Sequence, residues 1–262
     1  MRVEQLGTGD PELVIVGGVH GDEPCGERAI EWLLAEQPPV SRPVRLIVAN
    51  EAAIERGVRY LDADLNRSFD YVAAGSAHEA DLADQLREQI RGKTVLSIHS
   101  TQSTRDPFAI VSGVTEGVAP IVSRLSVEAV VDAGPPEDGR IFDTTATAIE
   151  VEAGYQGSEA ATENATQLAR EFLIATGALP GELEPVERPL FELGSPIQKP
   201  EAASYEVYAA NFSPVEEGDV IAAADEQPIR ADRPFWPVLL SAYGYRDIFG
   251  YRGEKQGSVS SV

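Results

Sequence analysis

The sequence predicts an α/β fold with a mixed central sheet and helices on both faces, followed by a small C-terminal all-β domain. Two observations carry this prediction. Over residues 1–177, short apolar runs that suit buried strands alternate with stretches of helical periodicity. After Gly177 the chain becomes rich in Pro and Gly, and only short β-like runs follow. We therefore expect one domain over residues 1–178 and a second over residues 179–262 that caps the cleft of the first.

Each element has its own signal. Apolar runs predict strands at residues 12–21, 44–50 and 94–101, with further candidates at 107–113 and 144–154. Helical periodicity covers residues 25–37, 76–92 and 158–177, and glycines end the last two. In the C-terminal region, β-like runs lie at residues 206–215, 219–225 and 234–245.

The charge of the chain is strongly acidic. Asp and Glu total 43 against 21 Lys and Arg, which gives a net charge of −22, and lysine occurs only at Lys93, Lys199 and Lys255. Such a surface repels nucleic acid and anionic membranes, so we expect neither as a partner. The acidity is spread along the chain, a composition typical of proteins that work in high salt, where screening removes most self-repulsion. We interpret the chain as halophilic.

The cellular location follows from what the sequence lacks. A single cysteine, Cys25, excludes an internal disulfide framework. The N-terminus has no signal-peptide apolar region, and no stretch approaches the roughly 20 apolar residues of a membrane helix. A cytoplasmic protein is the simplest expectation. Whether copies of the chain form a homo-oligomer stays open.

Two histidines and a glutamate lie at the ends of predicted strands. His20 and Glu23 follow the first strand within "GGVHGDE", and His99 ends the third within "SIHST". Open α/β sheets place ligand crevices at such strand ends. Zinc hydrolases use two imidazoles and a carboxylate as ligands and keep a fourth position for water. Asp22 is an alternative ligand, although its side chain would point away if His20 and Glu23 converge. The competing interpretation is ordinary hydrogen bonding, which we expect for His78 in its polar helix.

The segment "RYLDADLNRSFD" adds a second kind of chemistry. Asn66 and Arg67 suit a substrate carboxylate, because arginine binds it through two hydrogen bonds and the amide adds another. The alternative is an arginine on a solvated loop.

Four motifs in this order, "GGVHGDE", "DADLNRSFD", "SIHST" and "VEAG", resemble the aspartoacylase and succinylglutamate desuccinylase family, part of the wider zinc carboxypeptidase-like group. The resemblance implies one zinc ion held by His20, Glu23 and His99. It also implies that Asn66 and Arg67 bind a substrate carboxylate. Arg59 matches an arginine that polarises the scissile carbonyl, where it would stabilise the oxyanion.

The segment "AIEVEAG" offers two glutamates on one face of a strand, and an exposed strand edge is the alternative for both. The family pattern Glu-x-Gly fits Glu152, which we expect to act as general base and then as general acid. Glu150 would raise the pKa of Glu152 by its negative charge. In the C-terminal region, "WPVLLSAYGYRD" resembles the stretch that carries an active-site tyrosine, for which Tyr245 is our choice and Tyr243 the alternate. Ala242 departs from the glutamate often found there.

The sequence therefore predicts a zinc-dependent hydrolase that cleaves the linear amide of a small N-acyl amino acid or related compound. A carboxypeptidase-like peptidase and a zinc-binding protein without catalysis are the alternatives. Cys25 is expected to be a small buried residue, and Ser100 lacks the context of a nucleophile. If the substrate has a second carboxylate, Arg140 and Arg105 are candidates to bind it. The acyl group is not predicted.

Overall fold

The computed structural model of the protein describes residues 1–69, 78–135, 139–145 and 147–260. Its strands are β1 (Arg2–Leu6), β2 (Leu13–Gly17), β3 (Val44–Val48), β4 (Thr94–Thr101), β5 (Phe108–Val111), β6 (Val130–Asp132), β7 (Thr147–Tyr155), β8 (Arg188–Gln198), β9 (Tyr205–Val207), β10 (Val220–Ala224), β11 (Gln227–Arg230), β12 (Trp236–Val238) and β13 (Ile248–Val259). Its helices are α1 (Cys25–Glu36), α2 (Glu51–Arg56), α3 (His78–Ile90), α4 (Ala119–Val122) and α5 (Glu159–Ala175), with short 3-10 helices η1 (Leu65–Arg67) and η2 (Ile141–Asp143).

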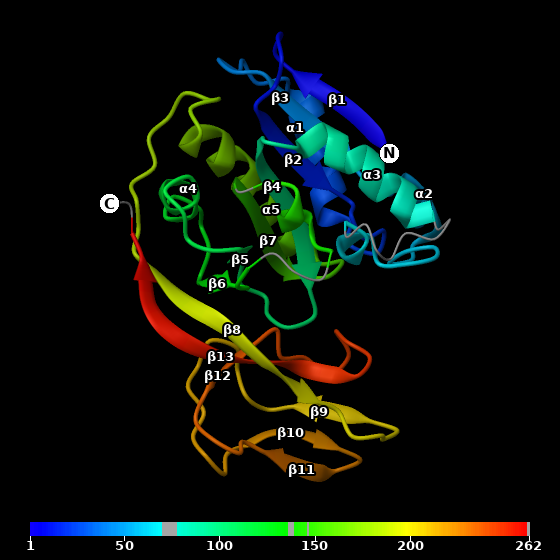
Figure 1. The fold of residues 1–262 in the computed structure, drawn as a ribbon, viewed down its shortest axis with the longest axis vertical. Helices are drawn as coiled ribbons and strands as arrows, with labels where there is room; N and C mark the ends of the chain where they lie inside the picture. The colour runs from blue at the N-terminus through cyan, green and yellow to red at the C-terminus, as the bar shows by residue number, and fades with distance from the viewer. Residues whose placement is uncertain (70–77, 136–138, 146, 261–262) are drawn as a thin grey trace.

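The described residues form a ten-stranded mixed sheet with the order β1-β3-β2-β4-β7-β5-β6-β8-β13-β12, and a three-stranded sheet β11-β10-β9 (Figure 1). The α/β fold class and the small C-terminal sheet are thus confirmed. The parallel strands β3, β2, β4 and β7 form the centre of the large sheet.

Helices cover both faces of this sheet because the buried strands are apolar on both sides. In β2, Leu13 and Ile15 face a core that includes buried residues of α1 and α5. The alternate residues Val14 and Val16 face a second core that includes buried residues of α3. A continuous apolar run is the expected pattern for a parallel strand packed between two helical layers.

The parallel arrangement gathers the ends of three strands. β4 pairs with β2 on one side and with β7 on the other, and His99 is in register with Glu152 of β7. The turn that contains His20 follows the end of β2. The predicted site residues on these strands therefore meet at one edge of the sheet.

The C-terminal region departs from the expectation of short β runs only. The Pro- and Gly-rich stretch after Gly177 contains β8, and the chain ends in the still longer β13, neither of which was expected. β8 pairs in parallel with β6 and antiparallel with β13, so the central sheet continues into this region. In Figure 1 these two strands lead from the helix-covered part of the molecule to the small sheet. The division into two domains at residue 178 stays a prediction.

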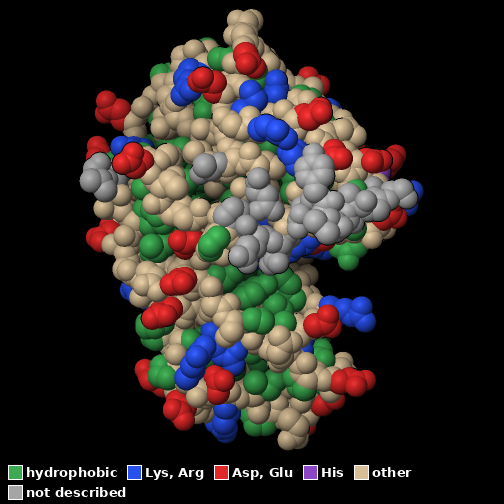
Figure 2. All heavy atoms as spheres, viewed as in Figure 1, with side chains coloured by type: hydrophobic (Ala, Val, Ile, Leu, Met, Phe, Trp, Pro, Cys, Tyr) green, Lys and Arg blue, Asp and Glu red, His purple; other side chains and the backbone are tan. Residues whose placement is uncertain are grey.

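The small sheet has a core of its own, formed by Ile197, Val215, Ile221, Ala222, Ala231, Phe235, Leu240 and Phe249. On the face drawn in Figure 2, Asp and Glu side chains are scattered over the surface rather than gathered in one patch. Among the described helices, none has both the length and the apolar character that crossing a membrane requires.

Candidate metal and substrate site

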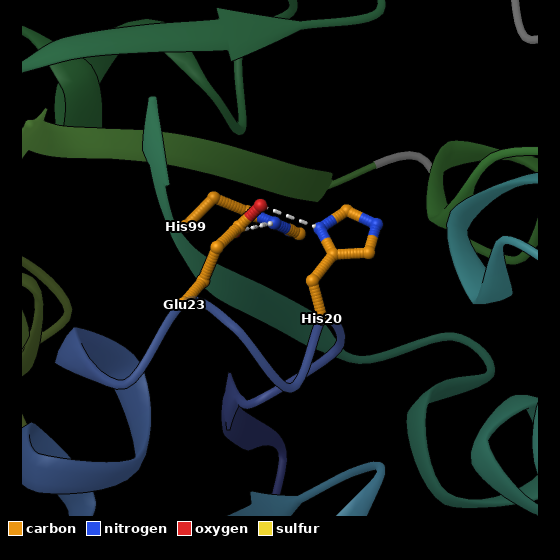
Figure 3. A group of neighbouring side chains, drawn as sticks. All are labelled: His20, Glu23 and His99. Carbon is orange, nitrogen blue, oxygen red and sulfur yellow. Dashed lines mark hydrogen bonds and ion pairs between the residues drawn. The ribbon is translucent and has the colours of Figure 1, made fainter. Parts of the chain in front are cut away.

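His20, Glu23 and His99 converge on one point (Figure 3). The Glu23 carboxylate lies between the two imidazoles, with Oε1 2.9 Å from Nδ1 of His20 and Oε2 3.1 Å from Nδ1 of His99. One ligand atom from each residue lies within 4.8 Å of the others. All three residues are buried, at 3–4% exposure. Two Nδ1 atoms and a carboxylate at this spacing are a donor set that suits zinc.

The outer nitrogen of each imidazole has its own partner. His20 Nε2 lies 3.0 Å from Oδ1 of Asp64, and His99 Nε2 lies 3.0 Å from Oγ of Ser97. If Nε2–H donates to Asp64, loss of the Nδ1 proton to a metal ion would leave Nδ1 as the lone-pair nitrogen that the metal needs. Such partners fix the orientation of metal-binding histidines and raise their basicity.

The turn that carries His20 and Glu23 depends on a glycine between them. Gly21 lies so close to α2 that an added Cβ would stand 2.2 Å from the backbone carbon of Ala53. The amide of Gly21 also donates to the carbonyl of Arg59 (3.1 Å). A side chain at position 21 would therefore push apart the two segments that supply the site.

The electrostatics of the cluster favour a bound cation. Burial opposes a charge on His20, but Glu23 and Asp64 outweigh it and raise the pKa of His20 to about 9. Burial likewise opposes ionisation of Asp64, yet hydrogen bonding to His20 and the charges nearby lower its pKa. Negative charge is thus concentrated around two imidazole nitrogens, an environment that attracts positive charge.

Glu152 occupies the same cavity on the neighbouring strand. Its Oε2 is buried and has no hydrogen-bond partner among the described residues. Burial first, and then the charge of Glu23, raise the pKa of Glu152 to about 7. Glu150 also raises this pKa, as expected, but it contributes less than burial and Glu23. A partnerless carboxylate that titrates near neutrality is suited to exchange protons with a substrate.

The Glu-x-Gly pattern after Glu152 has a structural cause. Gly154 has φ +127°, and an added Cβ would stand 2.6 Å from the carbonyl oxygen of Arg105. This backbone conformation and close approach need glycine. Arg105 contacts the strand here through its backbone and is not among the residues that line the cavity, whereas Arg140 is.

Arg59 and Arg67 both line the cavity, with different surroundings. Arg59 donates to Oε1 of Glu23 (2.9 Å) and to Oδ2 of Asp64 (3.3 and 3.2 Å). Arg67 donates from Nη1 to the carbonyl of Asn66 (2.6 Å). Arg59 is therefore held against the carboxylate of Glu23, a candidate metal ligand, while Arg67 shares no ion pair within the described chain.

Asn66 is held in place by both ends of its amide. Nδ2 donates to Oε1 of Glu150 (2.8 Å), and Oδ1 accepts from the amide of Ile141 (3.0 Å). One Nδ2 hydrogen is left for another acceptor. The predicted contact of Asn66 with a substrate carboxylate is thus compatible with its contacts to Glu150 and Ile141.

The C-terminal region contributes both candidate tyrosines. Tyr243 and Tyr245 line the cavity, and Tyr243 is 62% exposed while Tyr245 packs its ring edge-on against Tyr251. The cavity has a volume of about 280 Å³. It is lined by His20, Asp22, Glu23, Arg59, Asn66, Arg67, His99, Ser100, Thr101, Gln102, Ile110, Arg140, Glu150, Glu152, Gln156, Leu239, Ser241, Tyr243, Gly244 and Tyr245.

Two interpretations of single residues can be compared with the structure. Cys25 is buried, with its thiol donating to the carbonyl of His99 (3.4 Å), as expected for a small buried residue. The sequence did not predict that Asp64 is the hydrogen-bond partner of His20, although Asp64 lies in the "DLNR" segment. The feature that could have drawn attention to Asp64 is its position as the N-cap of η1, where its carboxylate accepts from the amide of Asn66.

Comparison with known proteins supplies the family. The model of the succinylglutamate desuccinylase/aspartoacylase catalytic domain matches residues 9–176 of the chain. The chain belongs to this family. The family's catalytic domain thus covers the strands and turns that supply the metal-ligand candidates and Glu152.

Curated relatives match part of the chain. The N-acyl-aromatic-L-amino acid amidohydrolase (carboxylate-forming) of Xenopus laevis is 43% identical over 106 residues, which are 35% of this chain and 35% of that protein. The aspartoacylase of Xenopus tropicalis is 29% identical over 102 residues, 38% of this chain and 32% of that protein. The matched segments span about a third of each relative.

Solved structures share the fold over nearly the whole chain. Murine aminoacylase 3 superposes with a TM-score of 0.72 at 20% identity, covering 96% of this chain and 98% of that chain. A succinylglutamate desuccinylase/aspartoacylase from Rhodobacter sphaeroides superposes with a TM-score of 0.76 at 16% identity, covering 97% and 88%.

Proposed function

We propose that this family member is a zinc-dependent amidohydrolase that cleaves the amide bond of a small N-acyl amino acid or related compound. The observation that carries the proposal is the meeting of two chemistries in one cavity. A metal-suited set, His20, Glu23 and His99, lies beside Glu152, whose buried Oε2 has no partner in the described chain. The relatives named above, amidohydrolases and aspartoacylases, support the same reaction class.

His20 Nδ1, His99 Nδ1 and the Glu23 carboxylate would hold the ion. Zinc bound there would lower the pKa of water and polarise the substrate carbonyl. Glu152 takes a proton from the attacking water at Oε2, and the water oxygen forms a bond to the carbonyl carbon. When the carbon–nitrogen bond breaks, Glu152 returns this proton to the leaving nitrogen, so a carboxylic acid and an amine result, and the acid then gives its proton to the amine. A pKa of about 7 suits a group that accepts and returns a proton near neutrality.

Arginines would provide the remaining stabilisation and binding. Arg59, next to Glu23, is suited to stabilise the negative oxygen that develops as water adds. Arg67 and Asn66 bind a substrate carboxylate, and Arg140 offers a second cation for substrates that have two. These arginines supply the positive charge that an anionic substrate requires within a strongly acidic chain.

The C-terminal region would close the cavity. Leu239, Ser241, Tyr243, Gly244 and Tyr245 line it opposite residues of the central strands. A cavity of about 280 Å³ formed in this way suits a small acyl amino acid better than a long peptide. We place the protein in the cytoplasm, in keeping with its single buried cysteine.

The test is metal content together with hydrolysis of a panel of N-acyl amino acids in molar KCl, before and after chelation. We expect about one zinc per chain and release of one amino acid from the panel that chelation abolishes and zinc restores. Release of a C-terminal residue from peptides instead would favour a peptidase. Zinc without turnover on either panel would favour a binding protein, and no zinc after reconstitution would refute the site.

A further inference from the structure

We propose that Lys199 is a positioning residue, whose ammonium fastens the segment of residues 239–247 against the substrate cavity. We call this segment the tyrosine loop, since it carries Tyr243 and Tyr245. It connects β12 to β13, and five of its residues line the cavity. The inference rests on the proposed function, because it assigns the loop a part in holding the substrate.

Lys199 contacts the far end of the tyrosine loop twice. Its Nζ donates to the carbonyl oxygen of Tyr245 (2.5 Å), and its backbone amide donates to the carbonyl of Asp247 (3.0 Å). Lys199 follows the end of β8, so these two bonds tie the loop to a strand of the central sheet. A charge-assisted hydrogen bond of this kind is roughly twice as strong as a neutral one.

Aromatic rings surround the same ammonium. Nζ lies 5.0 Å from the ring centroid of Tyr205, 5.4 Å from that of Phe249 and 6.0 Å from that of Tyr243. Each distance is within the range of a cation–π interaction. The cation therefore holds Tyr243 by its ring and Tyr245 by its backbone, and both residues line the cavity.

Tyr243 is also hydrogen-bonded to a strand of the small sheet. Tyr205, on β9, donates its backbone amide to the hydroxyl oxygen of Tyr243 (3.2 Å). The near end of the loop has separate support, since the amide of Ser241 donates to the carbonyl of Phe249 (2.7 Å). The amide of Gly244, in the part held by the ammonium, donates to Oγ of Ser241 (3.0 Å), and this bond should open more often when the ammonium is lost. Loss of the ammonium should thus free the Tyr243–Asp247 part of the loop and leave its near end in place.

The choice of residue type supports a specific role. The chain has three lysines and eighteen arginines. Position 199 is one of the three lysines, and its compact ammonium lies among three aromatic rings while it donates to a backbone carbonyl. Burial lowers the pKa of Lys199, and the charge of Asp247 opposes this shift.

Lys93 provides a matched control. Its Nζ also donates to a backbone carbonyl, that of Pro11 (2.6 Å), and its side chain is partly buried. It lies just before β4, at the opposite end of that strand from His99. Lys93→Met therefore removes a comparable ammonium–carbonyl bond that has no contact with the cavity.

The experiment compares Lys199→Met, Lys199→Arg and Lys93→Met with the wild type in zinc content, steady-state kinetics and amide hydrogen exchange. We expect Lys199→Met to bind zinc normally, to raise KM about tenfold with kcat little changed, and to exchange the amides of residues 243–247 about tenfold faster. Lys199→Arg retains a cation and a donor but replaces the compact ammonium with a larger guanidinium, so it should recover the KM only in part. Lys93→Met should leave both readouts unchanged.

Two results would overturn the proposal. Unchanged exchange in Lys199→Met would mean that the ammonium does not fasten the loop. Faster exchange with an unchanged KM would mean that the fastened loop does not serve the substrate. If the wild type hydrolyses nothing, the proposed function fails separately, and unchanged exchange would still refute the fastening itself.

Discussion

Glu152 differs from Glu23, Asp64 and Glu150 in its hydrogen bonding, and like Asp22 it has a buried carboxylate oxygen without a partner in the described chain. Both oxygens of Glu23 and of Asp64 accept hydrogen bonds, and Oε1 of Glu150 accepts one from Asn66. Oε2 of Glu152 is buried without a partner in the described chain. Carboxylates that are fully bonded are held as ligands or braces, whereas a carboxylate with a free oxygen can exchange a proton.

Replacing Glu152 should separate catalysis from metal binding. We expect Glu152→Gln to lower kcat by about 10²–10⁴-fold, because the amide group of glutamine can neither accept a proton from water nor return it to the leaving nitrogen. Zinc content should stay at that of the wild type. Glu150→Gln is the control, because Glu150 is a neighbouring carboxylate on the same face of β7. A glutamine at position 150 can still accept the hydrogen bond from Asn66, so this variant should lower kcat far less than Glu152→Gln. Unchanged turnover in Glu152→Gln would refute its role as the base.

Asp64 should tune the affinity for the metal without contacting it. Its carboxylate accepts from Nε2 of His20 and from Arg59, so it holds a candidate ligand and a candidate catalytic residue together. We expect Asp64→Asn to weaken zinc binding by about 10–100-fold, measured by competition with a chelator. Asp62→Asn, in the same loop, should have no effect. Equal zinc affinity in the two variants would contradict the assignment.

For single residues, the sequence predicts the candidate metal ligands better than the residues that hydrogen-bond to those ligands. His20, Glu23 and His99 are recognisable because imidazole and carboxylate side chains at strand ends are few in a chain with three histidines. Asp64 and Ser97 are not recognisable in the same way. One of 43 acidic residues, or one serine, becomes a partner of an imidazole only through tertiary packing.

Among the elements, α3 organises the loop that supplies Arg59, Asp64, Asn66 and Arg67. Glu79, in its first turn, is fully buried and accepts from the backbone amides of Leu61 (2.7 Å), Asp62 (3.0 Å) and Ala63 (3.1 Å). It also accepts from Nδ2 of Asn50 (3.1 Å). Burial opposes the charge, but these donors outweigh it and lower the pKa of Glu79.

Neutralising Glu79 should destabilise the protein. In Glu79→Gln the amide group would present N–H donors to backbone N–H donors, so we expect a loss of about 1–3 kcal/mol in the free energy of unfolding, measured with urea. Glu88→Gln, on an exposed position of the same helix, is the control.

The pH dependence tests the same assignment. Because the folded pKa of Glu79 is lowered, the ionised carboxylate stabilises the protein above its ordinary pKa, and this contribution is lost as the pH falls through the folded value. The difference between wild type and Glu79→Gln should therefore shrink in acid. A difference that grows as the pH falls would contradict this account.

Elements were predictable where local pattern and packing agree. The apolar run of β2 and the periodicity of α5 are explained by burial between layers, and both appear close to the expected positions. β8 was missed because its sequence, RPLFELGSPIQ, has two prolines and one glycine and mostly exposed or half-buried residues. It is a strand because β6 and β13 pair with it on either side, which no local window of sequence reveals.

At the scale of the whole molecule, a net charge of −22 opposes both the compact fold and the binding of the proposed anionic substrate. The acidic residues are scattered over the visible surface (Figure 2), while Arg59, Arg67 and Arg140 line the cavity. Dispersed negative charge destabilises the compact state through self-repulsion. Arg67 and Arg140 would supply positive charge where the proposed substrate binds, because Arg59 is already paired with Glu23 and Asp64.

Salt should therefore stabilise this protein. At 0.1 M salt the screening length is about 10 Å, which leaves neighbouring surface carboxylates in repulsion, and at 1 M it is about 3 Å. We propose that the chain is adapted to high salt and expect its Tm to rise steadily between 0.05 and 2 M KCl. Sucrose at matched osmolality is the control, because it acts by exclusion from the surface without screening charge. An equal rise in sucrose would assign the effect to exclusion. A Tm that is flat or falling in KCl would mean that self-repulsion is not what limits the stability of this fold.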